Sequence, residues 1–137
     1  MRPVATRILV PGRPALGPAL VLTAPISFWG GVDPKSGRIA DVRHPQAGAL
    51  VSGQVMFLPG TIGSSSAAAV LLELVHAKLA PSALVLDEPD AILLLGLIVA
   101  REMGLPVPIA VQLAKAEQGA WAGRQVAIGD DGVMSAV

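Results

Sequence analysis

The sequence predicts a single α/β domain in which a mixed β-sheet carries two main helices. The chain has 137 residues, of which 53% are hydrophobic, and this suits one domain with a substantial core. Between residues 54 and 111 the apolar patterns alternate in the order strand, helix, strand, helix, strand. Such a βαβαβ unit implies parallel strand pairing. The first part of the chain is richer in short strands and turns, which we expect to join the same core.

The first half of the chain has the pattern of short strands separated by breakers. Residues 6–10 and 19–23 are β-favouring runs, and Gly17-Pro18 is a strong breaker between them. Residues 25–53 form a long and mostly irregular segment, in which residues 38–42 are a candidate for a short strand. A loop of this length is uncommon in a compact domain and is usually functional.

The second half supplies the alternating unit. Residues 54–58 predict a buried strand, and residues 64–79 predict a helix because apolar residues recur at spacings of three and four. Residues 83–86 are continuously apolar, as in a central strand. Asp90 is placed to cap a second helix over residues 91–103.

The C-terminal part adds two further strand signals. Residues 107–111 complete the alternating unit, and residues 128–133 enclose Asp130-Asp131-Gly132, which is typical of a hairpin turn. The sequence contains no internal repeat and no low-complexity tract. We therefore expect one domain over residues 1–137.

Charge and composition exclude several classes of function. Lys plus Arg and Asp plus Glu number 10 each, so the basic excess needed for nucleic-acid binding is missing. The absence of Cys removes disulfides, thiolate nucleophiles and cysteine-ligated metal or iron–sulfur sites within this chain. The longest apolar stretch, residues 91–100, is too short for a bilayer, and no signal-peptide pattern is present. We expect a cytoplasmic chain that binds no membrane and tends to self-associate when alone.

A glycine- and serine-rich loop between the strand at 54–58 and the following helix is the sharpest local motif. Gly60 and Gly63 allow a tight turn, and Ser64, Ser65 and Ser66 add hydroxyl groups where the helix begins. The free amides of a helix N-terminus favour a bound carboxylate or phosphate. The alternative is that Ser64 or Ser65 is simply an N-cap. A phosphate-binding P-loop is excluded because Ser64 stands where that motif has Lys.

A serine-hydrolase arrangement is a weaker interpretation of the same loop. The segment around Ser65 is close to the G-x-S-x-G pattern. His76, however, is ten residues beyond Ser66 on the same predicted helix, about 15 Å away by the helical rise. His44 would have to act as the base, and no third member of a triad is identifiable.

The long irregular segment contains a second candidate site. Ser27, Phe28, Trp29 and Gly30 place half of the aromatic residues in a glycine-rich loop that also holds Asp33. The aromatic side chains form either core plugs beneath the loop or the wall of a ligand or partner site.

Four further polar residues have no role fixed by pattern alone. A lone histidine such as His44 is more often structural than catalytic. Asp87, Glu88 and Asp90 lie where a central strand ends and a helix begins, an edge at which α/β sheets bind ligands. They could equally be solvated caps.

Several of these motifs together resemble the small subunit of the aconitase X family. The resemblance covers roughly residues 17–110, with the motifs in the family's order: residues 25–38, His44-Pro45, Gly63-Ser64-Ser65-Ser66, and residues 88–93 with Gly96. It implies a swivelling β/β/α domain of the aconitase superfamily. It also implies a dehydratase (hydro-lyase) acting on cis-3-hydroxy-L-proline or mevalonate 5-phosphate. Such a domain works with a large subunit whose cysteines hold an iron–sulfur cluster, so this chain would bind no cofactor or metal itself.

The resemblance also assigns roles around the serine loop. Ser64 matches the serine that acts as catalytic base, while the Lewis-acidic iron of the large subunit takes the leaving hydroxyl. Family members often carry a basic residue where this chain has Ile62, which slightly favours the unphosphorylated cis-3-hydroxy-L-proline. Ala67 also replaces a family glycine. The expected substrate contacts are Ser27, Phe28, Trp29, Gly30, Gly63, Ser65 and Ser66.

Two alternatives come from other functional classes. The chain could be a non-catalytic binding or regulatory module that keeps the swivel fold, because fold does not fix function. It could also be a phosphohistidine carrier that uses His44. From the composition and from Phe28 and Trp29 in a loop, we expect the chain to bury an apolar patch against its large partner.

Overall fold

The computed structural model describes all residues from Met1 to Val137. Its main feature is an eight-stranded mixed sheet with the order β1-β10-β9-β3-β6-β7-β8-β2, beside a small sheet of β4 and β5. The strands are β1 (Val4–Ala5), β2 (Arg7–Val10), β3 (Ala15–Val21), β4 (Val32–Asp33), β5 (Arg38–Ile39), β6 (Val55–Leu58), β7 (Ala83–Leu86), β8 (Ile109–Gln112), β9 (Gln125–Ile128) and β10 (Val133–Ala136).

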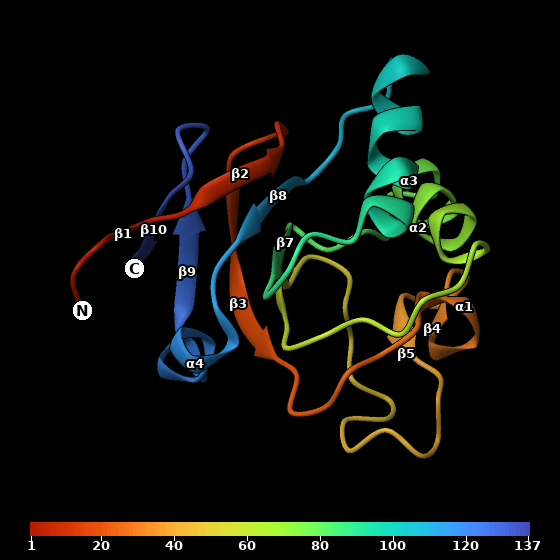
Figure 1. Ribbon diagram of the computed structural model, residues 1–137, viewed down its shortest axis with the longest axis horizontal. Coiled ribbons are helices and arrows are strands. Elements are labelled where there is room, and N and C mark those ends of the chain that lie inside the picture. Colours follow the sequence, from red (N-terminus) through yellow and green to blue (C-terminus); the bar gives the residue numbers. More distant parts are fainter.

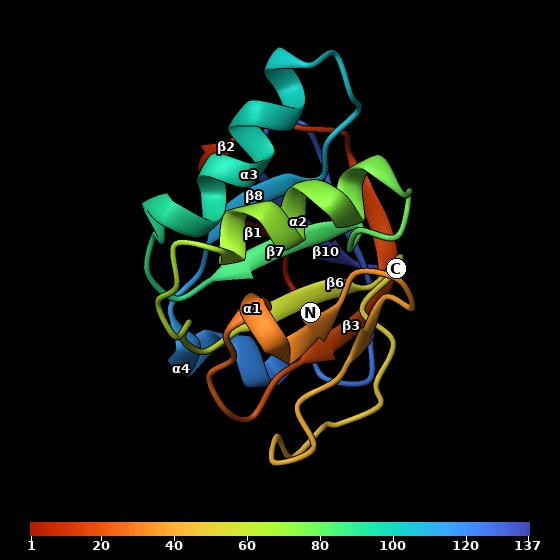
Figure 2. The same cartoon turned by 90° about the vertical axis from the view of Figure 1, so that its right-hand side faces the viewer.

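The predicted βαβαβ unit forms the centre of the molecule. Strands β6, β7 and β8 pair in parallel, and they are joined by α2 (Ala67–His76) and α3 (Ala91–Glu102). Both helices lie on one side of these strands, and the β9–β10 hairpin lies on the other (Figure 1). Figure 2 shows α2 and α3 side by side in front of the parallel strands. The parallel pairing of the βαβαβ unit and its two main helices, both predicted from the sequence, are confirmed.

Alternating side chains of the parallel strands build two cores, one on each face of the sheet. On the helix side, Met56 and Leu84 pack with the apolar faces of α2 and α3. On the opposite side, Phe57 and Val85 pack with Trp121 and the β9–β10 strands. Strands buried on both faces are continuously apolar, which explains why the sequence pattern alone identified β6 and β7.

Strand β3 is longer than the sequence predicted, and it includes the supposed breaker Gly17-Pro18. The strand pairs with β9 over Ala15–Pro18 and with β6 from Ala19 onward. Pro18, which has no N–H, therefore falls where the strand changes its hydrogen-bonding partner. Gly17 is required by crowding, because a Cβ there would overlap the backbone oxygen of Gly53.

The two main helices lie where they were predicted, but α2 is shorter at both ends than the predicted residues 64–79. It ends at His76, and Lys78 has a left-handed φ of 61° that helix geometry does not allow. The sequence predicted a helix from residue 64, but α2 begins at Ala67, and the three serines form the turn that leads into it. Helix α3 begins after Asp90, whose side chain accepts hydrogen bonds from the N–H groups of Ile92 and Leu93. The predicted N-cap of α3 is confirmed.

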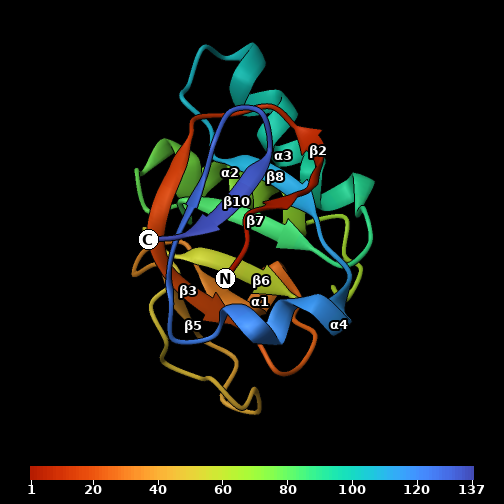
Figure 3. The same cartoon turned by 90° about the vertical axis from the view of Figure 1, so that its left-hand side faces the viewer.

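Two short helical segments were not predicted. Residues 25–53 are mostly irregular, as expected, but Phe28–Gly31 form the short segment α1, which contacts α2. Its backbone departs from helical angles at Trp29 and Gly30. Near the C-terminus, α4 (Lys115–Gln118) continues into a 3₁₀ turn, η1 (Gly119–Trp121). Figure 3 shows α4 on the side of the sheet away from α2 and α3. No helix has both the length and the apolar character that crossing a membrane requires.

Candidate functional site

The serine loop lies at the carboxyl end of β6, where the chain turns into α2. The backbone N–H of Ser66 donates to Ser64 Oγ over 3.2 Å, and the N–H of Ala67 donates to the Ser64 carbonyl over 3.1 Å. Ser66 occupies the N-cap position, but its side chain forms no capping hydrogen bond. Ser66 rather than Ser64 or Ser65 therefore stands at the N-cap position of α2, while Ser64 Oγ holds an N–H group of the turn that leads into the helix.

The surroundings of Ser64 suit a group that carries developing negative charge. Its side chain is half-buried, whereas Ser65 is exposed. It accepts one backbone N–H and stands just before the positive end of the α2 dipole. Both features favour an anionic oxygen at Ser64 or an anionic group bound beside it.

The structure brings the two candidate loops of the sequence together. The backbone N–H of Ile62 donates to the carbonyl of Ile26 over 3.0 Å, and Ile26 and Thr61 form an isolated parallel bridge. The residue after Ile26 is Ser27, so the aromatic loop begins beside the serine loop. Segments about 35 positions apart in the sequence thus form one surface.

The two aromatic residues of that loop have opposite roles. Phe28 is only 1% exposed and belongs to the core on the helix side. Its side chain supports the loop from beneath, so the expected substrate contact through Phe28 is corrected. Trp29 is 61% exposed and is free to meet a ligand or a partner. The adjacent Gly30 has φ of 75°, a left-handed conformation that favours glycine.

Asp33, at the end of β4, stabilises the turn that leads to β5. The backbone N–H of Lys35 donates to Asp33 Oδ1 over 3.0 Å. This hydrogen bond, with a second one from the Ser36 side chain, lowers the pKa of Asp33 below its usual value. Asp33 is thus a structural residue of the turn before β5.

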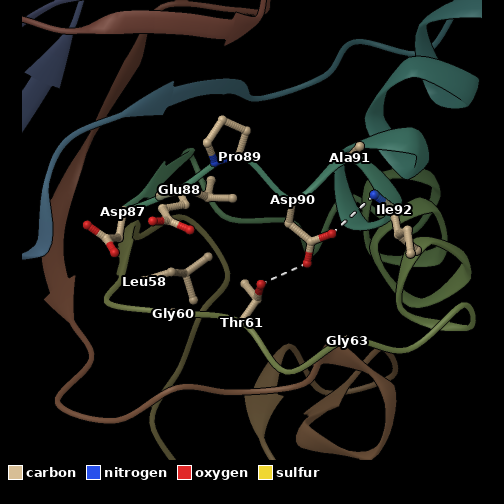
Figure 4. A pocket seen from close by; sticks show the side chains of 11 residues that line it. Leu58, Gly60, Thr61, Gly63, Asp87, Glu88, Pro89, Asp90, Ala91 and Ile92 are labelled. Atoms are coloured by element: carbon tan, nitrogen blue, oxygen red, sulfur yellow. Dashed lines mark hydrogen bonds between the residues drawn. The ribbon is translucent and has the colours of Figure 1, made fainter.

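An open pocket of about 530 Å³ lies beside the serine loop (Figure 4). Its walls come from the carboxyl ends of β6 and β7, the start of the serine loop and the start of α3. The carboxylates of Asp87, Glu88 and Asp90 line it, and no Lys or Arg does. The full lining is Leu58, Gly60, Thr61, Gly63, Leu86, Asp87, Glu88, Pro89, Asp90, Ala91 and Ile92.

Two of these carboxylates hold the backbone around the pocket. Asp87 Oδ1 accepts the backbone N–H of Lys115 over 2.8 Å, which ties β7 to the start of α4. Asp90 caps α3 and also accepts a hydrogen bond from Thr61 Oγ1 over 2.7 Å. Glu88 is exposed at the rim.

His44 is a structural residue, as the commoner of the two interpretations predicted. It is only 7% exposed. Its Nε2 lies 3.0 Å from the carbonyl oxygen of Ala24, and its Nδ1 accepts the backbone N–H of Gln46 over 3.0 Å. Both ring nitrogens are occupied by backbone groups, so neither is available as a base or as a phosphate carrier.

Two residues of the site region were missed by the sequence analysis. Gln118 is 2% exposed, and its Nε2 donates to the carbonyls of Leu58 and Leu113. Its Oε1 has no partner. Thr61, which bonds to Asp90, was noticed only as part of the serine loop. No local sequence pattern predicts these roles, because Thr61 bonds to Asp90 and Gln118 bonds to Leu58, each far away in the sequence.

The residues of this chain do not fit an iron–sulfur cluster. It has no Cys, and no three His, Asp or Glu side chains come together in a group that could hold a metal ion. Cluster ligation depends on thiolates, or on histidines in some centres.

The fold and this site together define a class of protein. A βαβαβ unit with both helices on one side and the β9–β10 hairpin on the other agrees with the swivelling β/β/α domain that the resemblance implied. The chain belongs to the aconitase X swivel domain family, whose sequence model matches residues 3–135.

Named relatives fall into two groups. A cis-3-hydroxy-L-proline dehydratase of Pseudomonas aeruginosa is 45% identical over 108 residues, which cover 78% of this chain and 18% of the relative. A phosphomevalonate dehydratase small subunit of Methanothermobacter thermautotrophicus is 38% identical over 91 residues, which cover 66% of this chain and 67% of the relative. The chain thus spans about a fifth of the length of the first relative.

A solved structure supports the fold assignment. The crystal structure of aconitase X from Thermococcus kodakaraensis in its holo-form superposes with a TM-score of 0.85. The match covers 100% of this chain and 99% of that chain, at 24% sequence identity. The predicted swivel fold is confirmed.

Proposed function

We propose that this chain is the small subunit of a heteromeric dehydratase of the aconitase X type. The observation that carries the proposal is the family match over residues 3–135 combined with the position of Ser64 before α2. The large partner supplies the iron–sulfur cluster, since this chain has no ligands for one. A cytoplasmic location stays a prediction from the sequence.

In the proposed reaction, Ser64 acts as the base. Its oxygen takes the proton from the carbon next to the substrate carboxylate, and the released electron pair forms a carbon–carbon double bond. The hydroxyl on the neighbouring carbon leaves as hydroxide and takes up the abstracted proton from Ser64, so that the products are the unsaturated acid and water. A serine hydroxyl is a weak base unless its anion is stabilised, and the N–H of Ser66 and the α2 dipole provide such stabilisation.

The proposed substrate contacts surround Ser64. Gly63, Ser65 and Ser66 would offer backbone and hydroxyl donors to the carboxylate of the substrate. Ser27, Trp29 and Gly30 would close the site from the adjoining loop, which the hydrogen bond between Ile62 and Ile26 holds in place.

The pocket charge supports a preference for cis-3-hydroxy-L-proline over mevalonate 5-phosphate. The imino acid carries an ammonium group beside its carboxylate, whereas the phosphorylated acid carries two anionic groups and no cation. Asp87, Glu88 and Asp90 line the pocket without a Lys or Arg, and such a wall attracts an ammonium group and repels a phosphate. Ile62, which is 57% exposed, adds no positive charge to the serine loop.

A large partner would also cover apolar surface that this chain exposes. One side of α3 carries Ile92, Leu95, Ile98, Val99 and Met103, each at least 38% exposed. This apolar row of α3 starts at the pocket, because Ile92 lines it. Together with Trp29, the row supports an interface with the large subunit near the site, and self-association of the chain when alone.

The test is to produce the chain with and without the large subunit and to assay both substrates. We expect turnover by the assembled pair only, with a higher kcat/KM for cis-3-hydroxy-L-proline. Turnover by the isolated chain would contradict its dependence on the partner. Failure to bind any cysteine-bearing large subunit would favour the non-catalytic binding module.

A further inference from the structure

The loop that carries Ser64 is held at its start by a side-chain hydrogen bond from Thr61. Thr61 Oγ1 donates to Asp90 Oδ2 over 2.7 Å, although the two residues are 29 positions apart. Figure 4 shows this hydrogen bond as a dashed line between two side chains of the pocket lining. Hydrogen bonds from a hydroxyl to a carboxylate are short and among the stronger ones in proteins.

Asp90 is a fixed acceptor for this bond. Its other oxygen, Oδ1, accepts the backbone N–H groups of Ile92 and Leu93 over 3.1 Å each. Helix α3 is anchored in turn, because Leu93 and Leu97 are at most 1% exposed. The cap therefore sets the orientation of the carboxylate, which leaves Oδ2 directed at Thr61.

Little else fixes the chain between Thr61 and Ser64. The side chain of Ile62 is 57% exposed, and no atom lies within 4 Å of the position that a Cβ on Gly63 would take. The backbone N–H of Ile62 donates to the Ile26 carbonyl over 3.0 Å, and Ser64 accepts the N–H groups of Ser66 and Ala67 from the turn before α2. Hydrogen bonds rather than packing thus determine where the serine loop runs.

We propose that Thr61 is a positioning residue for Ser64, acting through Asp90. This inference rests on the proposed function, in which Ser64 is the base. The Thr61–Asp90 bond joins the loop to the rigid start of α3 and so holds Ser64 Oγ at the distance that proton abstraction needs. Misplacing a reacting group by about 1 Å can cost on the order of 10²-fold in rate.

The kinetic test compares Thr61→Val with Thr61→Ser in the assembled enzyme. Valine keeps the branched shape and removes the donor, whereas serine keeps the donor. We expect Thr61→Val to lower kcat by roughly 10- to 100-fold with KM changed less than about threefold. We expect Thr61→Ser to stay within about threefold of the wild-type kcat. Deuterium at the abstracted position should slow Thr61→Val more than wild type, because proton abstraction becomes the slower step.

Three kinetic results would overturn the inference. They are a wild-type kcat in Thr61→Val, an equal loss in Thr61→Ser, or a loss confined to KM. A purely structural role would instead lower the melting temperature of both variants without a change in the isotope effect.

A second measurement on the chain itself separates this inference from the proposed function. We expect Thr61→Val to speed amide hydrogen exchange over residues 60–66, while the amides of Ile92 and Leu93 stay protected by Asp90. An unchanged rate of amide exchange over residues 60–66 would show that the Thr61–Asp90 hydrogen bond does not hold the serine loop, whatever the activity. Wild-type turnover by Ser64→Ala would overturn the assignment of Ser64 as base, but it would not contradict the role of the Thr61–Asp90 hydrogen bond in holding the loop.

Discussion

Gly96 on α3 lies directly against the backbone carbonyl of Ala68 on α2, so that a Cβ on Gly96 would be 2.5 Å from that oxygen. The glycine is buried and lies in the helix interior, where glycine is normally unfavourable. Its place is explained by the close approach of the two helices. Because α2 begins after the serine loop and α3 begins at Asp90, this contact also fixes the spacing between the two ends that build the site.

We expect Gly96→Ala to destabilise the chain. Alanine gains about 1 kcal/mol in helix propensity, but a Cβ that close to a carbonyl forces the helices apart, and overpacking costs about 1–3 kcal/mol. Urea denaturation should show a lower free energy of unfolding. The matched control is Gly119→Ala, since Gly119 is helical with open space around its Cβ position, and it should be neutral or slightly stabilising. A more stable Gly96→Ala protein would contradict the close approach.

Much of the fold could be predicted from the sequence because the central elements have strong and local signals. β7 is apolar at every position, and the Asp90 cap precedes a helix that ends near a glycine. The predicted bounds of β3 and α2 were wrong because contacts between distant parts of the chain determine where these elements begin and end. Strand β3 passes through Gly17-Pro18 because it changes partners there. The serines stay outside α2, whose apolar pattern begins only at Ala67.

The candidate site was predicted in part, for a similar reason. The serine loop and the aromatic loop were recognised from composition, but their contact through Ile26 and Ile62 is a tertiary feature. The burial of Phe28 could not be read from a glycine-rich loop. The hydrogen bond between Thr61 and Asp90 could not be predicted either, because a threonine and an aspartate 29 positions apart form no recognisable sequence motif.

The apolar row of α3 leads to a prediction about assembly. We expect Val99→Lys to weaken the complex with the large subunit, because a lysine placed inside an apolar interface loses its hydration. Val99 is 38% exposed, so the isolated chain should keep its melting temperature within about 2 °C. Sedimentation velocity of the mixture measures the complex. The control is Val42→Lys, at a site 87% exposed in the long irregular segment, which should assemble normally. Equal assembly by both variants would exclude the α3 row from the interface.

Ile62 provides a test of substrate preference. Ile62→Arg adds a cation to the start of the serine loop, beside a pocket that has none. We expect the ratio of kcat/KM for mevalonate 5-phosphate over cis-3-hydroxy-L-proline to rise about tenfold, which corresponds to about 1.4 kcal/mol. Ile62→Gln, similar in length but uncharged, is the control and should leave the ratio nearly unchanged. The rise should shrink in high salt because the side chain is exposed. A ratio unaffected by Arg would mean that the partner supplies the charge that selects the substrate.

Ser64→Ala separates the catalytic role from a structural one. The variant loses the oxygen that would take the proton, so kcat of the assembled enzyme should fall by about 10²–10⁴-fold, the usual contribution of a positioned base, with substrate affinity nearly intact. It also loses the acceptor for the Ser66 N–H, which costs about 1 kcal/mol of stability. Ser65→Ala and Ser66→Ala are the controls, because their hydroxyls would serve anion binding and should raise KM more than they lower kcat. Steady-state kinetics and melting curves on the three variants distinguish the roles. If Ser64→Ala keeps kcat within about threefold of wild type and only melts several degrees lower, Ser64 is a structural residue of the turn before α2.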